Sequence, residues 1–516
     1  MRKIAALYHN ELIKICRKVS VWVILGIMVL GVFGIAGMMK LTVATEEKYE
    51  TMNQQSHDEW KKAQLEDSLL EYKGQLETLR VQLAAAEEES AQMELQMQIQ
   101  EAEQQVALYE EAIRRDINLD FYDLGSLSFT SPALHSYIEY QFEIERLKAA
   151  PAGDMESAKQ LKKAEEYYAL AKKSLDEMDY SSYLELQNRL IQDNSSMNDE
   201  EKEMMISLNA LRLKVDPKGE QKSDVEQALQ KIEAEKRSLI YNIDYFNDTA
   251  VNAPLTPAQR TKMENDIAVQ TYRLENGLTF STSSAKETMS AMGSSVLFSF
   301  GVFLIGILMM VLAGGSISQE MSSGTIKSLI ISPTKRWKIF VAKLLSLLTV
   351  GVLSTLLLYL VSILSTAVWF GSEGFLPYVT ASGGKAMEIN FFLYQLADAF
   401  VQFIDVFVFM LFAFMLSIVT RNTAASVGIS IGVYFGGSMA MTMVGQFLKG
   451  EWINFIPFTN LSLSTKFFPY SGLNNMMTGM GIVNTGTSLP FSLCYLAVLC
   501  ICMLYVAKDS FCRRDI

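Results

Sequence analysis

The chain has 516 residues, of which 50% are hydrophobic and 20% charged, and its five cysteines and three histidines are too scattered to predict a disulfide framework or a metal site. The formal net charge of −12 is unevenly placed, because residues 40–293 hold 28 basic and 48 acidic residues while the rest of the chain carries a net charge of +8. The apolar residues gather in runs long enough to cross a bilayer, so the composition predicts a membrane protein with a separate acidic part.

Residues 1–20 predict a cytoplasmic amphipathic helix that lies on the membrane face. Apolar Leu7, Leu12 and Ile15 alternate there with charged residues such as Glu11 and Lys14. An apolar run over residues 21–39 follows and is just long enough to span the hydrocarbon. It lacks a small-residue cleavage site at its end, so we read it as a retained first transmembrane helix, with a cleaved signal peptide as the alternative.

Residues 40–293 predict a helical stalk and head outside the cytoplasm. Two apolar stripes have coiled-coil spacing, the second out of phase with the first: Leu65, Leu69, Tyr72, Leu76, Leu79, Leu83 and Ala86, then Leu95, Ile99, Ala102, Val106, Tyr109 and Ile113. We expect one helix over residues 56–115, on the order of 90 Å long. A returning helix over residues 225–246 would complete an antiparallel stalk, with residues 116–216 as its head.

The stalk and the head each allow two interpretations. The stalk could bind a partner or simply hold the head away from the membrane. Aromatic residues crowd the head and could form a ligand-binding surface or the core of a small helical domain. They include Phe121, Tyr122, Phe129, Tyr137, Tyr140, Phe142, Tyr167, Tyr168, Tyr180 and Tyr183.

Residues 294–516 contain five further apolar runs, so the chain is predicted to be an all-α membrane protein with six transmembrane helices. The runs cover residues 295–315, 343–369, 399–419, 424–447 and 489–507. In this topology most of the basic residues outside residues 40–293 fall on the side of the two termini. The positive-inside rule therefore places both termini and the loop 316–343 in the cytoplasm of a cell-membrane protein, and residues 40–293 outside.

No catalytic or nucleotide-binding motif occurs along the chain. The segment most similar to a phosphate-binding loop is Gly383-Gly384-Lys385. It lacks the required earlier glycine and falls on the outer side of the membrane. A nucleophile elbow and an H-E-x-x-H helix are also absent. We expect neither an enzyme nor a cofactor bound by this chain, and no nucleic-acid partner.

Polar residues form a stripe along the fourth predicted span. Gln395, Asp398, Gln402 and Asp405 are spaced by three, four and three residues, so they share one side of a helix. A carboxylate facing lipid is costly, and the stripe should therefore face protein or water. It is a candidate translocation path for a cationic or amphipathic substrate, or else a hydrogen-bonded contact between helices.

Small residues form a ridge along the fifth predicted span. Gly428, Gly432 and Gly436 are each four residues apart, and this spacing lets two helix backbones approach closely. The ridge suits either dimerisation or packing within the chain.

Three sets of residues together resemble the permease subunit of a type-2 ATP-binding-cassette (ABC) exporter. They are the segment Asn10-Glu11-Leu12-Ile13-Lys14, the loop residues Glu320, Gly324, Thr325, Leu329, Pro333 and Arg336, and the C-terminal Arg513-Arg514-Asp515-Ile516. The resemblance implies that the loop 316–343 forms a coupling helix that docks on an ATPase, and Glu320 can pair with a basic residue of that partner. It also implies that residues 449–488 dip back into the outer half of the membrane.

The same resemblance implies two copies of a separate ATPase subunit, which would bind ATP and Mg²⁺, and a second permease subunit to form a homodimer in the lipid bilayer. Residues 40–293 depart from the smaller members of that family. A large helical domain at this point is similar to phage-infection-protein-like membrane proteins. The alternative function is therefore a membrane assembly or receptor subunit whose stalk and head bind an extracytoplasmic envelope partner.

Overall fold

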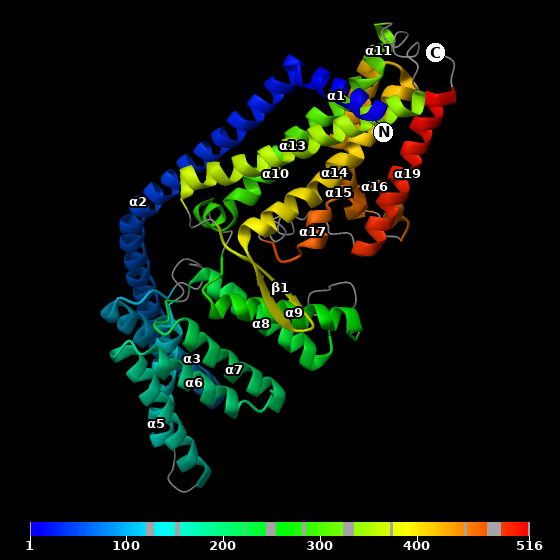
Figure 1. Ribbon diagram of the computed structural model, residues 1–516. Helices are drawn as coiled ribbons and strands as arrows, with labels where there is room; N and C mark the ends of the chain where they lie inside the picture. Colours follow the sequence, from blue (N-terminus) through cyan, green and yellow to red (C-terminus); the bar gives the residue numbers. More distant parts are fainter. Residues whose placement is uncertain are drawn as a thin grey trace. The chain divides into compact units, whose positions relative to one another are not determined.

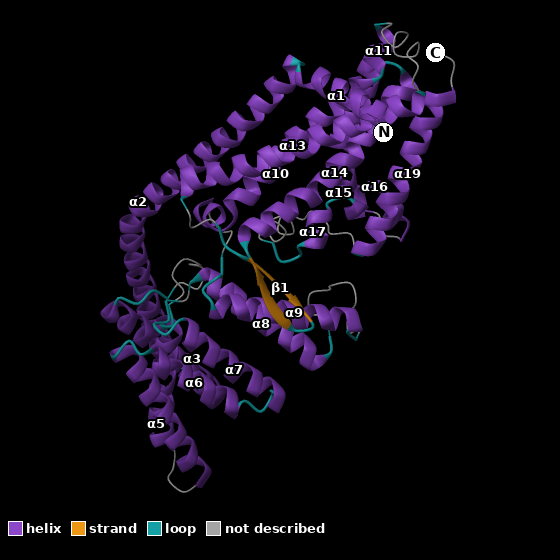
Figure 2. Cartoon of the chain, viewed as in Figure 1, coloured by secondary structure: helices purple, strands orange, loops and turns teal. Residues whose placement is uncertain are grey.

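The computed structural model describes residues 2–119, 128–149, 155–220, 222–243, 254–280, 285–323, 335–371, 375–447, 451–471 and 487–513. These residues form two compact units (Figure 1). The first comprises Met1–Ala44, Ser281–Thr380 and Met387–Ile516, and the second comprises Thr45–Phe280 and Ala381–Ala386. Helix is the dominant structure in both (Figure 2).

The first unit is a helical bundle. Its helices are α1 (Arg2–Cys16), the first part of α2 (Val19–Ala85), α10 (Ala285–Ser316), α11 (Ser318–Ser322), α13 (Arg336–Phe370), α14 (Phe391–Thr420), α15 (Thr423–Phe447), the 3-10 helix η1 (Glu451–Phe455), α16 (Pro457–Asn460), α17 (Leu463–Phe467) and α19 (Leu489–Arg513). It also holds the outer ends of the strands β1 (Tyr378–Ser382) and β2 (Lys385–Ile389), whose inner ends belong to the second unit. The central helices α10, α13 and α14 pack side by side (Figure 1).

Five helices among the described residues are long and apolar enough to cross a membrane, which indicates a predominantly helical membrane protein. They cover Val19–Glu46, Ala291–Ser322, Arg336–Phe370, Phe391–Thr420 and Leu489–Arg513. A shorter apolar stretch, Thr423–Gly437, belongs to α15. The third span begins at Arg336, seven residues before the apolar run predicted from the sequence, and this difference places Lys343 well inside a helix.

Close packing between α10 and α13 depends on a small residue. A Cβ atom added to Gly301 of α10 would lie 2.1 Å from a methyl carbon of Leu358 on α13. Leu358 and its neighbours Leu297 and Phe298 are completely buried. The two helices therefore meet at a distance that only glycine permits, as is common between membrane helices.

The second unit contains the rest of α2 and seven further helices. These are α3 (Glu89–Arg115), α4 (Thr130–Ala149), α5 (Met155–Asp176), α6 (Tyr180–Asp193), α7 (Asp199–Val215), α8 (Ser223–Tyr241) and α9 (Pro257–Glu275). Side chains cap several of them, including Asn198 at the start of α7 and a reciprocal capping box between Thr256 and Gln259 at the start of α9.

The prediction of one continuous helix over residues 56–115 is wrong, because the chain folds back between α2 and α3. Ion pairs join Lys73 to Glu110 at 2.7 Å and Arg80 to Glu103 at 2.8 Å, so the two helices run antiparallel. The phase change between the two apolar stripes explains the turn. On one continuous helix, Ala86 and Leu95 would lie on nearly opposite sides of the helix axis. Both stripes can share one interface only if the chain reverses direction between them.

The predicted returning helix forms as α8, but its partners are different from those expected. Val225, Leu229 and Ile232 are buried in a cluster with Leu208 of α7 and Leu274 of α9. The antiparallel stalk is therefore made by α2 and α3, and α8 belongs to a separate helical layer. A spacing of three and four residues predicts a buried helix face but does not identify the helix that covers it.

The aromatic residues of the head form core, as one of the two interpretations predicted. Phe129 and Tyr180 are 2% and 1% exposed and their ring centroids lie 5.1 Å apart. Tyr167 packs in a second small cluster with Leu186. Phe121 and Tyr122 lie outside the described residues.

A two-stranded hairpin between α13 and α14 was not predicted. Gly383 and Gly384 form its turn with φ values of +59° and +73°, a backbone conformation that glycine adopts readily. Gly383 and Gly384, which partly match a phosphate-binding loop in sequence, thus form a hairpin turn. A Gly-Gly pair between two short β-type runs was the available signal.

Two buried carboxyl groups, Glu235 of α8 and Asp266 of α9, both lie near Lys231. The lysine Nζ is 4.0 Å from a Glu235 oxygen and 3.9 Å from an Asp266 oxygen. Burial, reinforced by the charge of Asp266, raises the pKa of Glu235 to about 8 against the weaker opposing effect of Lys231 and Lys262. Because this pKa is raised in the folded state, its contribution to stability is complete at low pH and is lost as the pH rises through about 8.

We therefore expect the unfolding midpoint of the full chain in detergent to fall between pH 5 and pH 9, by on the order of 5 °C. Glu235→Gln should flatten this dependence, because an amide needs no proton to be neutral. Glu264→Gln, which changes an exposed carboxylate on α9, should leave it unchanged. Equal pH profiles for the wild type and Glu235→Gln would contradict the assignment.

Candidate functional site

Four charged residues meet where α1, α11 and α13 converge, and we call them the Lys343 cluster: Glu11, Lys14, Glu320 and Lys343. The Nζ atom of Lys343 lies 2.8 Å from Glu11 Oε2 and 2.9 Å from Glu320 Oε1. Lys14 adds bonds of 2.8 Å to Glu11 and 3.2 Å to Glu320. Two ammonium groups and two carboxylates thus form an alternating, electrically neutral cluster.

The cluster is buried at its centre and open at its edge. The side chain of Lys343 is 3% exposed, those of Glu11 and Glu320 are 12% and 16% exposed, and that of Lys14 is 52% exposed. Burial would raise the pKa of Glu11, but Lys343 and Lys14 outweigh it and hold this pKa below its ordinary value. Each charge therefore depends on the others, because an uncompensated buried charge is strongly destabilising.

The turn between α10 and α11 is held from several sides. Lys343 Nζ donates to the Ser316 carbonyl at 3.3 Å, and the backbone N–H groups of Ile317 and Ser318 donate to Ser417 Oγ of α14. On α15, the hydroxyl of Ser426 donates to the Gly314 carbonyl at 2.8 Å. A displacement of α11 would therefore be felt by α1, α13, α14 and α15 together.

Only part of the predicted coupling loop belongs to the cluster. Arg336 is the first residue of α13, while Gly324, Thr325, Leu329 and Pro333 lie outside the described residues. Glu320, which was expected to pair with a basic residue of a partner, pairs instead with two lysines of its own chain. Its carboxylate is used to join α11 to α1 and α13.

Sequence reasoning missed the role of Lys343 and the burial of Glu11. The available signal was a charge on an apolar helix face. Glu11 follows Leu7 by four residues and precedes Ile15 by four, so it lies on the stripe that α1 turns toward the bundle. Lys343 likewise follows Ile339 and precedes Leu347, both of which are buried. Opposite charges on two apolar faces predict a buried ion pair.

The polar stripe of α14 faces other parts of the bundle. Gln395 and Asp398 are 0% and 1% exposed, and Gln402 is 9% exposed. Gln395 accepts a hydrogen bond from Ser295 of α10 at 2.8 Å. Asp398 and Asp405 both point to α17, through Ser464 Oγ and the Leu463 N–H respectively. The stripe thus makes contacts between elements of the chain in this structure.

The glycine ridge of α15 faces open space. Gly428, Gly432 and Gly436 are exposed, and a Cβ atom added at any of them would meet no described atom within 4 Å. Packing within the chain therefore does not require glycine at these three positions. Gly437, one residue further on, does require it, because an added Cβ would overlap the ring of Phe458.

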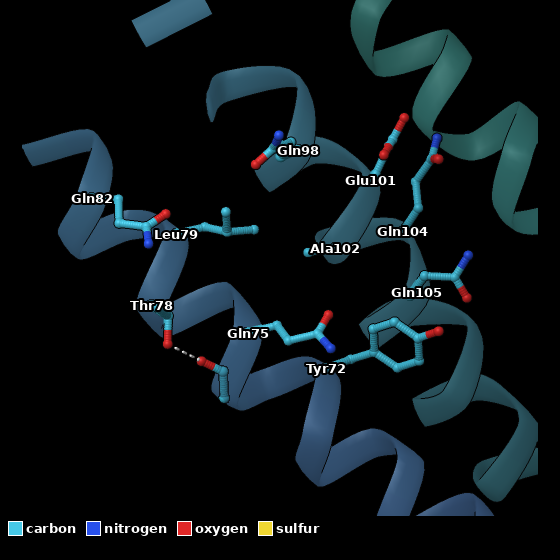
Figure 3. Close-up of a pocket in the computed structure, with 11 residues that line it drawn as sticks. Tyr72, Gln75, Thr78, Leu79, Gln82, Gln98, Glu101, Ala102, Gln104 and Gln105 are labelled. Carbon is cyan, nitrogen blue, oxygen red and sulfur yellow. Dashed lines mark hydrogen bonds between the residues drawn. The ribbon is translucent and has the colours of Figure 1, made fainter. Parts of the chain in front are cut away.

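The second unit has an open groove of about 710 Å³ between α2 and α3 (Figure 3). Its lining is dominated by carboxamides: Gln75, Gln82, Gln98, Gln104 and Gln105. Glu101 is its one charged lining residue, and Tyr72 at its end stacks on Tyr109 with centroids 5.4 Å apart. Such a groove can exchange hydrogen bonds with solvent or a ligand. Across the described part of the chain, no three His, Cys, Asp or Glu residues are grouped to hold a metal ion.

The family match lies in the C-terminal half of the chain. Residues 263–516 match the family described as "Protein of unknown function (DUF2705)". The chain is 27% identical over 263 residues to the "Uncharacterized protein YhcI" of Bacillus subtilis (strain 168). The aligned region covers 50% of this chain and 78% of that relative. It is 30% identical over 214 residues to the "Uncharacterized membrane protein YdbK" of the same organism, with 41% and 78% covered. No solved structure matches the chain.

Proposed function

Since the chain belongs to the DUF2705 family, whose matched region begins at α9 and includes four of the five candidate spans, we propose that its function resides in the membrane unit. We propose that the chain is the permease subunit of an ABC exporter. Two copies would form the translocation path, and two separate ATPase subunits would bind ATP and Mg²⁺ and supply the work. Six spans with both termini in the cytoplasm and residues 40–293 outside complete the proposal.

The Lys343 cluster is the observation that carries this proposal. A permease that hydrolyses no ATP needs a cytoplasmic contact point that is mechanically tied to its spans. The cluster ties α11, at the start of the loop 316–343, to α1 and α13 through a lysine that is 3% exposed. Interior packing is close and transmits displacement, so a force on this loop would move the bundle as a whole.

Two of the three sequence motifs that carry the resemblance meet in this cluster. Glu11 and Lys14 come from the N-terminal motif, and Glu320 comes from the loop motif more than 300 residues later. Their direct ion pairing supports a shared task for the two motifs. In the exporter proposal, α1 flanks the coupling helix and moves with it.

Affinity purification of the full chain from native membranes tests the proposal. We expect an ABC ATPase to be retained at about one copy per permease and to hydrolyse ATP in the complex. Purification with an envelope or secretion protein, and without any ATPase, would favour the alternative of an assembly or receptor subunit. The second unit supports that alternative, because residues 45–262 lie outside the family match and form helical layers of their own.

The proposed homodimer makes a separate prediction for the glycine ridge. Gly432→Leu should leave the unfolding midpoint of the single chain almost unchanged, because the position faces open space. The same change should convert dimers to monomers if two α15 helices approach along the ridge. Light scattering of the detergent-solubilised protein measures both states. A Gly432→Leu chain that remains dimeric would place the dimer contact elsewhere.

A further inference from the structure

The segment formed by α16 and α17 lies between α14 and α19 and is held from both sides. Its helices have only four and five residues, and isolated helices of this length are not stable in themselves. Leu463 is nevertheless completely buried and belongs to the core of the membrane unit. The position of the segment must therefore be set by its contacts with the neighbouring long helices.

On the α14 side the contacts are made by two carboxylates. Asp398 accepts a hydrogen bond of 2.5 Å from Ser464 Oγ and one of 2.7 Å from Gln402 Nε2. Seven residues further along, Asp405 accepts the backbone N–H of Leu463 at 3.3 Å. Asp405 is the fifteenth residue of the 30-residue helix α14, so α17 reaches the middle of this span.

On the α19 side the contacts use neutral oxygens. The ammonium group of Lys466 donates to Ser492 Oγ and Thr487 Oγ1, each at 2.6 Å, and to the Thr459 carbonyl at 3.1 Å. Ser492 of α19 in turn donates to Asn460 Oδ1 at 3.0 Å. Separation of α14 from α19 must therefore break one of these two sets of bonds.

We propose that Asp398 and Asp405 are positioning residues that hold α17 as a gate between α14 and α19, and that they do not form a binding surface for a cationic substrate. Both oxygens of Asp398 already have donors from the chain itself. The second oxygen of Asp405, Oδ1, is buried and has no hydrogen-bond partner among the described residues. In this arrangement the hydrogen-bonding capacity of the two carboxylates is therefore only partly used. Such incomplete hydrogen bonding suits a contact that forms and breaks.

The gate proposal rests on the proposed exporter function in one respect: ATP binding by the partner is what would open and close the gate. The contact itself concerns this chain alone. An experiment with and without the ATPase therefore separates the two: loss of the contact in the isolated chain overturns the gate, whereas absence of an ATPase overturns the exporter.

Thiol cross-linking of the pair Tyr394→Cys and Phe468→Cys tests the proposal in the full chain, after replacement of the five native cysteines by alanine. These two rings, on α14 and at the end of α17, lie 5.0 Å apart, and the pair leaves Asp398 and Ser464 in place. The purified protein, alone and with its ATPase, is treated with a short bismethanethiosulfonate reagent in nanodiscs. We expect efficient cross-linking without nucleotide and a loss of about fivefold or more with ATP and vanadate. The control pair Ser295→Cys and Gln395→Cys joins α10 to α14 and should cross-link in both conditions.

Two outcomes would overturn the gate. One is a failure of the Tyr394–Phe468 pair to cross-link without nucleotide while the control pair does so. The other is equal cross-linking with and without ATP in a complex that hydrolyses ATP, which would make the contact a static one.

Substitutions separate the gate from a cation-binding surface. Asp398→Asn keeps a hydrogen-bond acceptor for Ser464 but removes the charge, and Asp398→Leu removes both. The gate predicts that ATP hydrolysis by the complex stays within about twofold of the wild type in Asp398→Asn and falls about tenfold in Asp398→Leu. Equal loss in the two variants would mean that the negative charge itself is required.

Discussion

Lys343→Met is expected to lower the unfolding midpoint of the purified chain by on the order of 10 °C. Methionine fills a similar volume but removes the ammonium group that lies 2.8 Å from Glu11 and 2.9 Å from Glu320. Of the two lysines in the cluster, only the half-exposed Lys14 would then remain beside the two partly buried carboxylates. Thermal unfolding in detergent, followed by circular dichroism, measures the loss.

Two control variants show whether charge is the cause. Lys338→Met changes a lysine five residues earlier on α13 that makes no ion pair within the described ranges, and it should have little effect. The double variant Glu320→Gln and Lys343→Met removes one charge of each sign and leaves the Glu11–Lys14 pair intact, so it should recover most of the stability. A double variant as unstable as Lys343→Met would indicate lost packing instead of an unpaired charge.

Glu320→Lys is expected to uncouple the ATPase while the spans still insert. The substitution places a third ammonium group beside Lys14 and Lys343 and replaces attraction between α11 and its neighbours by repulsion. A coupling free energy of 1–3 kcal/mol corresponds to a change of about 5–150-fold, so we expect permease-dependent ATP hydrolysis to fall about tenfold or more. The rate per complex in nanodiscs is the measurement.

Glu320→Gln is the matched control for this experiment. Glutamine keeps an acceptor oxygen for the two lysines, and its effect should be much smaller than that of lysine. Membrane levels of both variants, determined by quantitative blotting, show whether insertion is intact. Normal ATP hydrolysis in a well-inserted Glu320→Lys chain would mean that α11 transmits no force, and the proposed coupling would be wrong.

Much of the fold could be predicted because apolar length and helical spacing are local properties of the sequence. The five long spans follow from runs that a bilayer requires, and α8 follows from the buried face at Val225, Leu229 and Ile232. The choice of partners could not be predicted in the same way. Whether the stripe at Leu76 meets α3 or α8 depends on a turn at residues 86–88 that has no glycine or proline to mark it.

In the candidate site, too, several individual residues could be predicted from the sequence but their partners could not. The sequence singled out Glu320 and the segment containing Glu11 and Lys14, but as separate motifs. Their pairing depends on Lys343, which lies within an apolar run and was taken only as the start of a span. Long-range ion pairs leave no periodic signal, so only the three-dimensional arrangement reveals that one buried lysine joins the two motifs.

If a partner ATPase acts on this chain through the loop 316–343, cross-linking mass spectrometry of the purified complex will detect the ATPase at this loop. A lysine-reactive reagent would report on Lys327, Lys335 and Lys338 of this loop and on Lys18 beside it. We expect cross-links from an ABC ATPase to concentrate on these lysines and to be absent from the second unit. A complex without an ATPase, or an ATPase cross-linked only to residues 45–280, would contradict this expectation.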